Sequence, residues 1–110
     1  AVKTKQYSAA MIAFNFMNAP WTEKAVAAAH KADFGVIAMK AARPANMSRG
    51  RVTPPERLAK LDRLLTGDLK APMKAYAWAL RHPGLTACIS EMITAEHVTD
   101  NLQLAAAKKA

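Results

Sequence analysis

Blocks of apolar residues, separated by polar breaks, predict an alternation of strands and helices along the chain. Residues 9–16 (AAMIAFNF) are mostly apolar and predict a first strand. Residues 22–33 carry small apolar side chains at helical spacing and predict a helix, with Thr22 as its N-cap. Residues 36–39 are apolar at every position and run directly into Lys40, a pattern typical of a parallel strand covered on both faces.

In the second half of the chain, the pattern predicts a loop at 41–52 and two helices at 54–66 and 72–82. A strand at 85–89 and a final helix at 94–108 follow. The loop is rich in Pro, Asn, Ser, Arg and Gly. Thr53 and Glu56 stand three residues apart, as a capping box requires at the start of a helix. Thr94 is expected to cap the last helix.

The order β-α-β-α-α-β-α predicts one α/β domain over residues 1–110, with parallel strands joined by right-handed helical crossovers. Three strands with helices on one side leave both sheet edges bare and one sheet face without cover. Two architectures fit this order: a small three-layer α/β domain or dimer, and a piece of a (β/α)₈ barrel. Because the chemistry of parallel sheets lies beyond the carboxyl ends of their strands, Lys40 to Arg43 are either site residues or solvated strand-end residues.

The composition predicts a thin core. The 110 residues are 52% hydrophobic, which excludes a disordered tail, but much of that fraction is alanine, which buries little area. The expected core therefore depends on the larger apolar side chains, which are Met11, Ile12, Phe14, Phe16, Val36, Ile37, Leu58, Leu61, Leu65, Tyr76, Trp78, Leu80, Leu85, Ile89, Val98 and Leu102.

The charge is strongly basic, with 16 Lys and Arg against 8 Asp and Glu and a formal net charge of +8. Such a balance suits phosphate-bearing partners, including nucleic acid or a phosphorylated cofactor. Residues 49–81 hold an excess of basic side chains, but they carry no nucleic-acid reader motif, and their aromatic residues fall in the helical core pattern. A solvated basic face is therefore favoured over nucleic-acid binding.

Cysteine and histidine usage predicts neither a disulfide nor a metal site. Cys88 is the only cysteine, and neither His30 nor His82 has a second ligand one helical turn away. No apolar run approaches the roughly 20 residues of a membrane span, and no signal-peptide pattern opens the chain, so we expect a cytoplasmic location. Because residue 1 is not Met, a processed terminus and a fragment of a longer chain both stay open.

Three segments carry the most distinctive motifs: GVIAMKAARP at 35–44, AWALRHPGLTACISEM at 77–92 followed by TAEHVTDNL at 94–102, and AMIAFNFMN at 10–18. The segment at 35–44 resembles the seventh strand of the aldo/keto reductases, where the family motif is typically GVIAMKP. The segments at 77–92 and 94–102 resemble the family's eighth strand and last helix, typically WVL-NP-VT-IPGM and PEQVEENL. The segment at 10–18 resembles the sixth strand, typically VQ-EYNPL. The matches follow the family's order along the chain.

The resemblance implies the last three β/α units of a TIM barrel. The family's catalytic Asp, Tyr, Lys and His lie on earlier strands, which no stretch of this chain matches, so no catalytic residue is assigned here. The implied role is the C-terminal half of an oxidoreductase that holds NAD(P)H, while the missing strands protonate a small carbonyl substrate.

The resemblance also implies cofactor-binding residues. Met39 would pack on the nicotinamide, while Lys40, Ala41 and Arg43 would lie along the pyrophosphate. At the start of the last helix, where the family uses Lys or Arg for the 2′-phosphate of NADP, His97 replaces the usual Arg or Gln. Asp100-Asn101 matches the family's Glu-Asn pair that contacts adenine.

Two departures weaken the implied cofactor site. Met11 replaces the Gln that supports the carboxamide, and Ser90-Glu91 replaces Pro-Gly. Glu91 would place negative charge near the expected phosphate. These departures, with the missing catalytic strands, favour an alternative of another class: a short, non-catalytic half-barrel protein that self-associates or pairs with a partner chain through its bare sheet edges.

Overall fold

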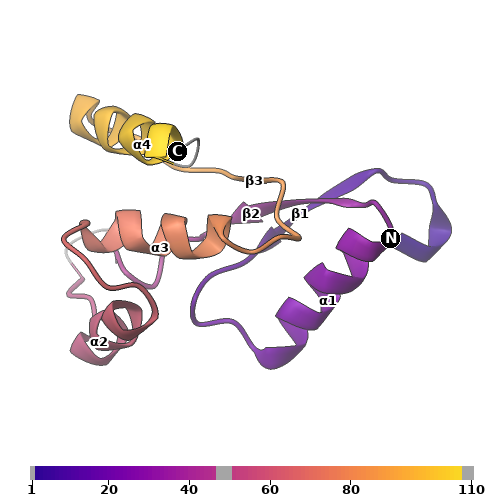
Figure 1. Ribbon diagram of the computed structural model, residues 1–110, viewed down its shortest axis with the longest axis horizontal. Helices are drawn as coiled ribbons and strands as arrows, with labels where there is room; N and C mark the ends of the chain where they lie inside the picture. The colour runs from indigo at the N-terminus through magenta and orange to yellow at the C-terminus, as the bar shows by residue number, and fades with distance from the viewer. Residues whose placement is uncertain (1, 47–50, 108–110) are drawn as a thin grey trace.

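The computed structural model describes residues 2–46 and 51–107, which form a mixed α/β structure (Figure 1). Its elements, in chain order, are a short 3₁₀-helix at Val2–Thr4, β1 (Ala9–Ala13), α1 (Pro20–Lys31), β2 (Gly35–Met39), α2 (Pro55–Leu64), α3 (Ala71–Leu80), β3 (Ala87–Cys88) and α4 (Ala95–Ala107). The kind and order of the seven main elements match the sequence prediction, although most bounds differ by one to three residues. Within the described ranges, no helix combines the length and apolar content needed to cross a bilayer.

The three strands form one parallel sheet in the order β1-β2-β3, as the sequence predicted. β1 and β2 pair along their full length, from Ala9 opposite Gly35 to Ala13 opposite Met39. β3 pairs with β2 only at Ala87 and Cys88, so it is shorter than predicted. A parallel connection needs a crossover, and α1 supplies the one between β1 and β2.

The first strand also ends earlier than predicted, because asparagine side chains take over the backbone bonds. Asn15 Oδ1 accepts a hydrogen bond from the Met17 backbone N–H, and Asn18 Oδ1 accepts one from the Asn15 backbone N–H. Such local side-chain bonds compete with a sheet ladder and favour a turn. Phe14 follows the strand directly, and its backbone N–H still donates to the Met39 carbonyl at 3.1 Å. The side chains of Phe14 and Phe16 are both buried in the core.

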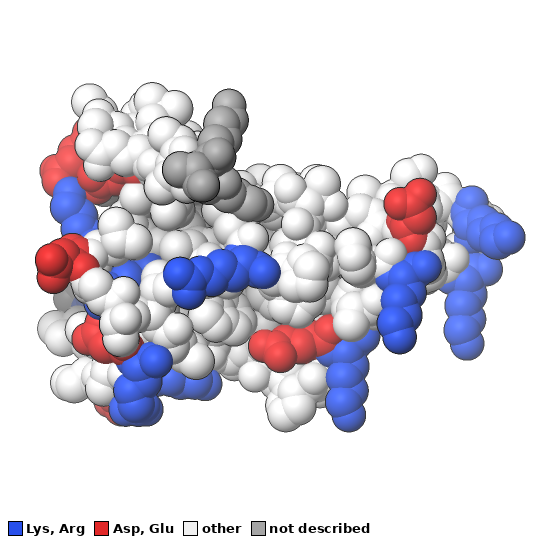
Figure 2. Space-filling view, in the orientation of Figure 1, with Lys and Arg blue, Asp and Glu red and all other residues white. Residues whose placement is uncertain are grey.

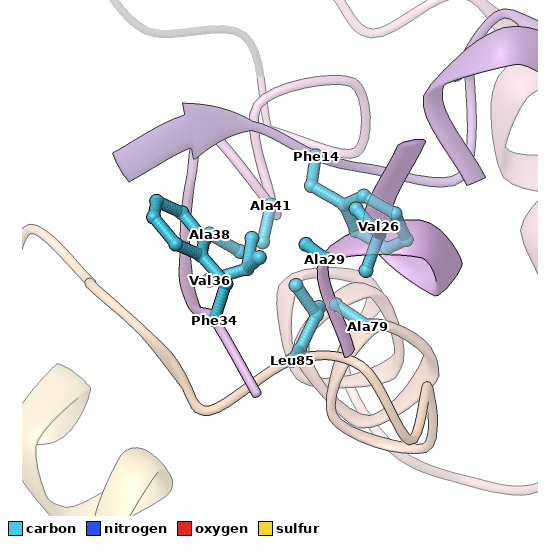
Figure 3. Packing of buried hydrophobic residues seen from close by; sticks show 9 residues of the cluster. All are labelled: Phe14, Val26, Ala29, Phe34, Val36, Ala38, Ala41, Ala79 and Leu85. Atoms are coloured by element: carbon cyan, nitrogen blue, oxygen red, sulfur yellow. The ribbon is translucent and has the colours of Figure 1, made fainter. Parts of the chain in front are cut away.

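The main core lies between the sheet and two helices. Val36 and Ala38 of β2 are buried against Val26 of α1 and Ala79 of α3. Figure 3 shows these side chains converging with Phe14, Phe34 and Leu85 around the same centre. Trp78 stacks on Phe14, with ring centroids 5.6 Å apart. The helices α1 and α3 thus cover one face of the sheet.

None of the described helices covers the opposite face of the sheet. Alternate strand residues point to this bare face, which consists of Ala9, Met11, Ala13, Ile37, Met39 and Ala87. Met11 is 48% exposed, so its prediction as core was wrong. Ile89, just beyond β3, is 46% exposed, so its prediction as core was also wrong. The apolar run at 36–39 therefore has one buried face and not the two that it predicted.

A second cluster joins α2 to α3. Leu61 of α2 packs with Phe16 and Ala75, and all three are buried. The same helix pair holds a charge: Lys74 of α3 has a side chain only 9% exposed, and its Nζ donates to Asp62 Oδ1 of α2 at 2.6 Å. A buried ammonium needs such a partner, because its desolvation is otherwise uncompensated.

Two of the three predicted helix caps were wrong. α1 begins at Pro20, whose fixed φ suits a first turn, so Thr22 lies inside the helix and is buried. α2 has Pro54 at its N-cap and no side-chain cap, and Thr53 Oγ1 donates to the Ala45 carbonyl. The Thr94 cap of α4 was right, since Thr94 Oγ1 accepts from the His97 backbone N–H.

The last helix, α4, stands apart from the main core (Figure 1). None of its described residues is buried, and it packs against α3. Val98 and Leu102 are 42% and 65% exposed, so their prediction as core was also wrong.

The Asp62–Lys74 ion pair gives a stability prediction. Asp62→Ala leaves the buried Lys74 ammonium without its partner, and we expect it to lower the free energy of unfolding by about 1–2 kcal/mol, because water still reaches the exposed carboxylate side. Lys74→Met keeps the packed stem and should cost less. Urea denaturation measures both, with the exposed Asp68→Ala as control. Equal losses for Asp62→Ala and Asp68→Ala would contradict this account.

Close packing at Gly84 gives a second prediction. A Cβ at Gly84 would lie 2.7 Å from Val26 Cγ1 and 3.1 Å from the Val26 carbonyl oxygen. Gly84→Ala should therefore destabilise the fold by about 1–3 kcal/mol. Val26→Ala removes the nearest atom, so the double variant should lose less stability than the sum of the single variants. Strict additivity in thermal or urea unfolding would show that this contact is not the cause.

Candidate functional site

A cavity of about 160 Å³ lies where the chain leaves β2 and β3 and where α3 faces α4. We call it the α3–α4 cavity. Its lining comes from the segment after β2 (Ala42, Asn46), from α3 and its N-cap (Lys70, Pro72, Met73, Tyr76), from the segment after β3 (Ser90, Glu91) and from α4 (Glu96, His97, Asp100, Asn101). The segments after β2 and after β3 stand 44 or more positions apart, counted from Asn46 to Ser90, and they meet here beyond the carboxyl ends of two parallel strands.

A larger hollow of about 380 Å³ lies between the end of α2, α3 and α4. Its lining is mostly leucine and alanine, with Thr66 and Arg81 as the polar residues. Binding sites for polar small molecules combine an apolar wall with several convergent polar groups. The α3–α4 cavity has that convergence, so it is the better candidate although it is smaller.

Lys70 forms ion pairs with two of the carboxylates that line the α3–α4 cavity. Its Nζ donates to Glu96 Oε1 at 2.6 Å and to Asp100 Oδ2 at 2.8 Å. The hydrogen bonds from Asp100 and then Glu96 raise the pKa of Lys70 above its ordinary value, because both favour the charged ammonium. Acidic and basic side chains accordingly lie together at the left end of the molecule in Figure 2, where α4 faces α3.

The first turns of α4 are positioned by bonds to the segment before them. Thr94 caps the helix at His97, and His97 Nδ1 accepts from the Ile93 backbone N–H at 3.4 Å. Asn101 Nδ2 donates to Ser90 Oγ at 3.0 Å, which ties α4 to the end of β3.

The sequence-predicted cofactor residues separate into two groups. His97, Asp100 and Asn101 all line the α3–α4 cavity, as one site requires. The group after β2, which is Met39, Lys40, Ala41 and Arg43, does not line it; Ala42 does. The two groups thus lie on different parts of the strand-end region.

The turn after β2 explains where the second group goes. Lys40 has a left-handed φ of 58°, and its carbonyl accepts from the Arg43 backbone N–H at 3.2 Å. This turn leaves the Lys40 and Arg43 side chains exposed and buries Ala41 at 1% exposure in the main core. Met39 is half-buried at the end of the strand. The Ala41 side chain therefore packs in the core, and only the backbone of this residue could contact a ligand.

Sequence reasoning assigned neither Glu96 nor Lys70 to a site, although both line the cavity and contribute to its charge. Glu96 lies one turn before Asp100 on α4, so the helical period alone places both carboxylates on one face. Lys70 and Tyr76 carry no such signal, because α3 meets α4 only through the tertiary fold. Glu91 was noted as a departure from the family motif, and the structure places it in the lining.

The part of the chain that the structure describes holds no group of three or more His, Cys, Asp or Glu side chains able to bind a metal ion. Comparison with known proteins adds no assignment: no family model, no curated protein and no solved structure matches the chain significantly.

Proposed function

We propose that this chain is the C-terminal, cofactor-holding half of an NAD(P)H-dependent oxidoreductase similar to the aldo/keto reductases. The observation that carries the proposal is the meeting of His97, Asp100 and Asn101 with Ser90 in one cavity beyond the carboxyl ends of β2 and β3. His97, Asp100 and Asn101 share the helix α4, and the segment after β3 meets them through the hydrogen bond between Asn101 and Ser90. The strand-end position is also where parallel α/β folds bind ligands.

Two features of the fold support the barrel interpretation. The strands are parallel, sequential and joined by helices that cover one face of the sheet only. In a (β/α)₈ barrel the helices form an outer ring, while the inward face of each strand packs against the other strands. The bare face, with Met11, Ile37 and Met39 at least partly exposed, corresponds to that inward face.

The residues of the α3–α4 cavity fit the adenosine end of a nicotinamide dinucleotide. Carboxylates accept hydrogen bonds from ribose hydroxyls, and the Asn101 amide and Ser90 hydroxyl offer donors and acceptors to a base. Tyr76 and Met73 supply an apolar wall for a ring. At about 160 Å³, the cavity is smaller than the roughly 300–1,000 Å³ of sites for drug-sized ligands, so it would hold one end of the dinucleotide.

The bound cofactor would supply the hydride, and the chain's own residues would position it. Met39 lies at the end of β2, on the bare face, where its thioether would contact a nicotinamide ring. The exposed Lys40 and Arg43 follow it and would lie beside the pyrophosphate. The acid that protonates a small carbonyl substrate would come from strands outside this chain.

Dinucleotide binding tests this proposal directly. We expect the 110-residue chain to bind NADH weakly, with a Kd of about 0.1–1 mM, because only part of the ligand is covered. Asn101→Ala removes a cavity side chain and should weaken binding several-fold. Gln103→Ala changes an exposed amide on the same helix outside the cavity and should not. Isothermal titration calorimetry gives both values; folded protein that binds no NADH at millimolar concentration would overturn the proposal.

A second function is favoured by the bare face itself: a short half-barrel protein that acts by self-association. Purely parallel sheets are almost always covered on both faces. Here the bare face presents Met11 and Ile37, and β1 and β3 are edge strands among the described residues. Two copies would cover each other's bare faces through one self-complementary contact.

Solution mass tests the second function. If copies pair through the bare face, the chain should sediment at about twice 11.9 kDa near 100 µM, and Met11→Glu should return it to the monomer mass. Val52→Glu, at another exposed apolar position, should leave the dimer intact. A folded wild-type monomer at this concentration would contradict self-association.

A further inference from the structure

The charge lining the α3–α4 cavity is acidic, although the chain as a whole is strongly basic. Three carboxylates, those of Glu91, Glu96 and Asp100, line it together with one ammonium, that of Lys70, among the residues that the structure describes. The formal net charge of the chain is +8, so the negative charge of the cavity lining comes from the local arrangement of side chains and not from the overall composition. A ligand in the cavity therefore meets a local field opposite to the overall one.

Lys70 does not change the sign of that field. Its ammonium is held by Glu96 Oε1 at 2.6 Å and Asp100 Oδ2 at 2.8 Å, so two negative charges already compensate it. For a phosphate to recruit Lys70, it would have to displace two carboxylates that remain beside it. The chain thus lacks a free cation at this point in its described part.

The other residues of this end of the lining add negative charge or bond to the backbone. His97 Nδ1 accepts a hydrogen bond from the Ile93 backbone N–H. Glu91 has no basic partner among the described residues, and its carboxylate adds negative charge to the lining. A 2′-phosphate carries a charge of about −1.5 to −2 near neutral pH and would be repelled here.

Resting on the proposed function, we infer that the cofactor of this chain is the unphosphorylated dinucleotide, NADH, and that Glu91 and Glu96 are specificity-determining residues that reject NADPH. The same carboxylates that repel a 2′-phosphate accept hydrogen bonds from a free 2′-hydroxyl. One set of residues thereby favours the first ligand and disfavours the second, which is how specificity arises from a difference of affinities.

Parallel titrations of the full chain with NADH and with NADPH test this inference. We expect NADH to bind about tenfold more tightly in low salt, a difference of about 1.4 kcal/mol. The ratio should fall in 0.5 M NaCl, because exposed charges are screened over a few ångströms at such ionic strength. Binding is the readout, so no catalytic activity is needed.

Charge-neutralising variants identify the residues responsible. Glu91→Gln and Glu96→Gln should each strengthen NADPH binding about two- to fivefold while changing NADH binding less. Glu23→Gln, at an exposed position on α1 outside the cavity, removes the same charge and should leave the ratio unchanged. The comparison separates local charge from net charge.

The outcomes distinguish this inference from the function it rests on. NADH bound more tightly than NADPH, with a ratio reduced by both cavity variants, supports the inference. Equal binding, or tighter NADPH binding, overturns the inference and leaves the proposed function standing. Binding of neither dinucleotide to folded protein overturns the proposed function and the inference with it.

Discussion

The packing of alternate β2 residues against two helices is the contact on which the rest of the structure depends. Val36 and Ala38 point into the core, where Val26 of α1 and Ala79 of α3 meet them (Figure 3). Burying a valine side chain contributes about 1.5–3 kcal/mol, and the small alanines let the helices approach the strand closely. Because β2 pairs with both other strands, fixing its face fixes the face of the whole sheet.

The candidate site follows from this arrangement but is held by weaker forces. The strands bring the segments after β2 and β3 to the same end of the sheet. The helix α4 contributes four polar residues to the lining, although none of its described residues is buried. The contacts that hold α4 against the rest of the fold include the Lys70 ion pairs and the Asn101–Ser90 hydrogen bond. Exposed ion pairs contribute only about 0–1 kcal/mol each, so a ligand that bridges α3 and α4 would add substantially to their docking.

The hydrophobic pattern predicted the kind and order of the seven main elements, because the helical and strand periods are local properties of the sequence. It did not predict which sheet face is covered, since Met11 and Ile89 are as apolar as Val36, and only the placement of α1 and α3 distinguishes them. The ion pairs of Lys70 in the cavity were not predicted for a related reason. Lys70 stands 26 and 30 residues from its two partners, a separation that no periodicity encodes.

The two proposed functions place different demands on the same sheet. The bare face requires a cover, whether from further strands of a barrel or from a second copy, because an apolar surface in water is unfavourable. No residue of the bare face lines the α3–α4 cavity, whose walls come from the strand-end segments, α3 and α4. A cover over the bare face would therefore leave the cavity lining in place. A cover and a ligand in the cavity would thus use different residues, whereas Met39, which belongs to the bare face, would be shared by the cover and a nicotinamide ring.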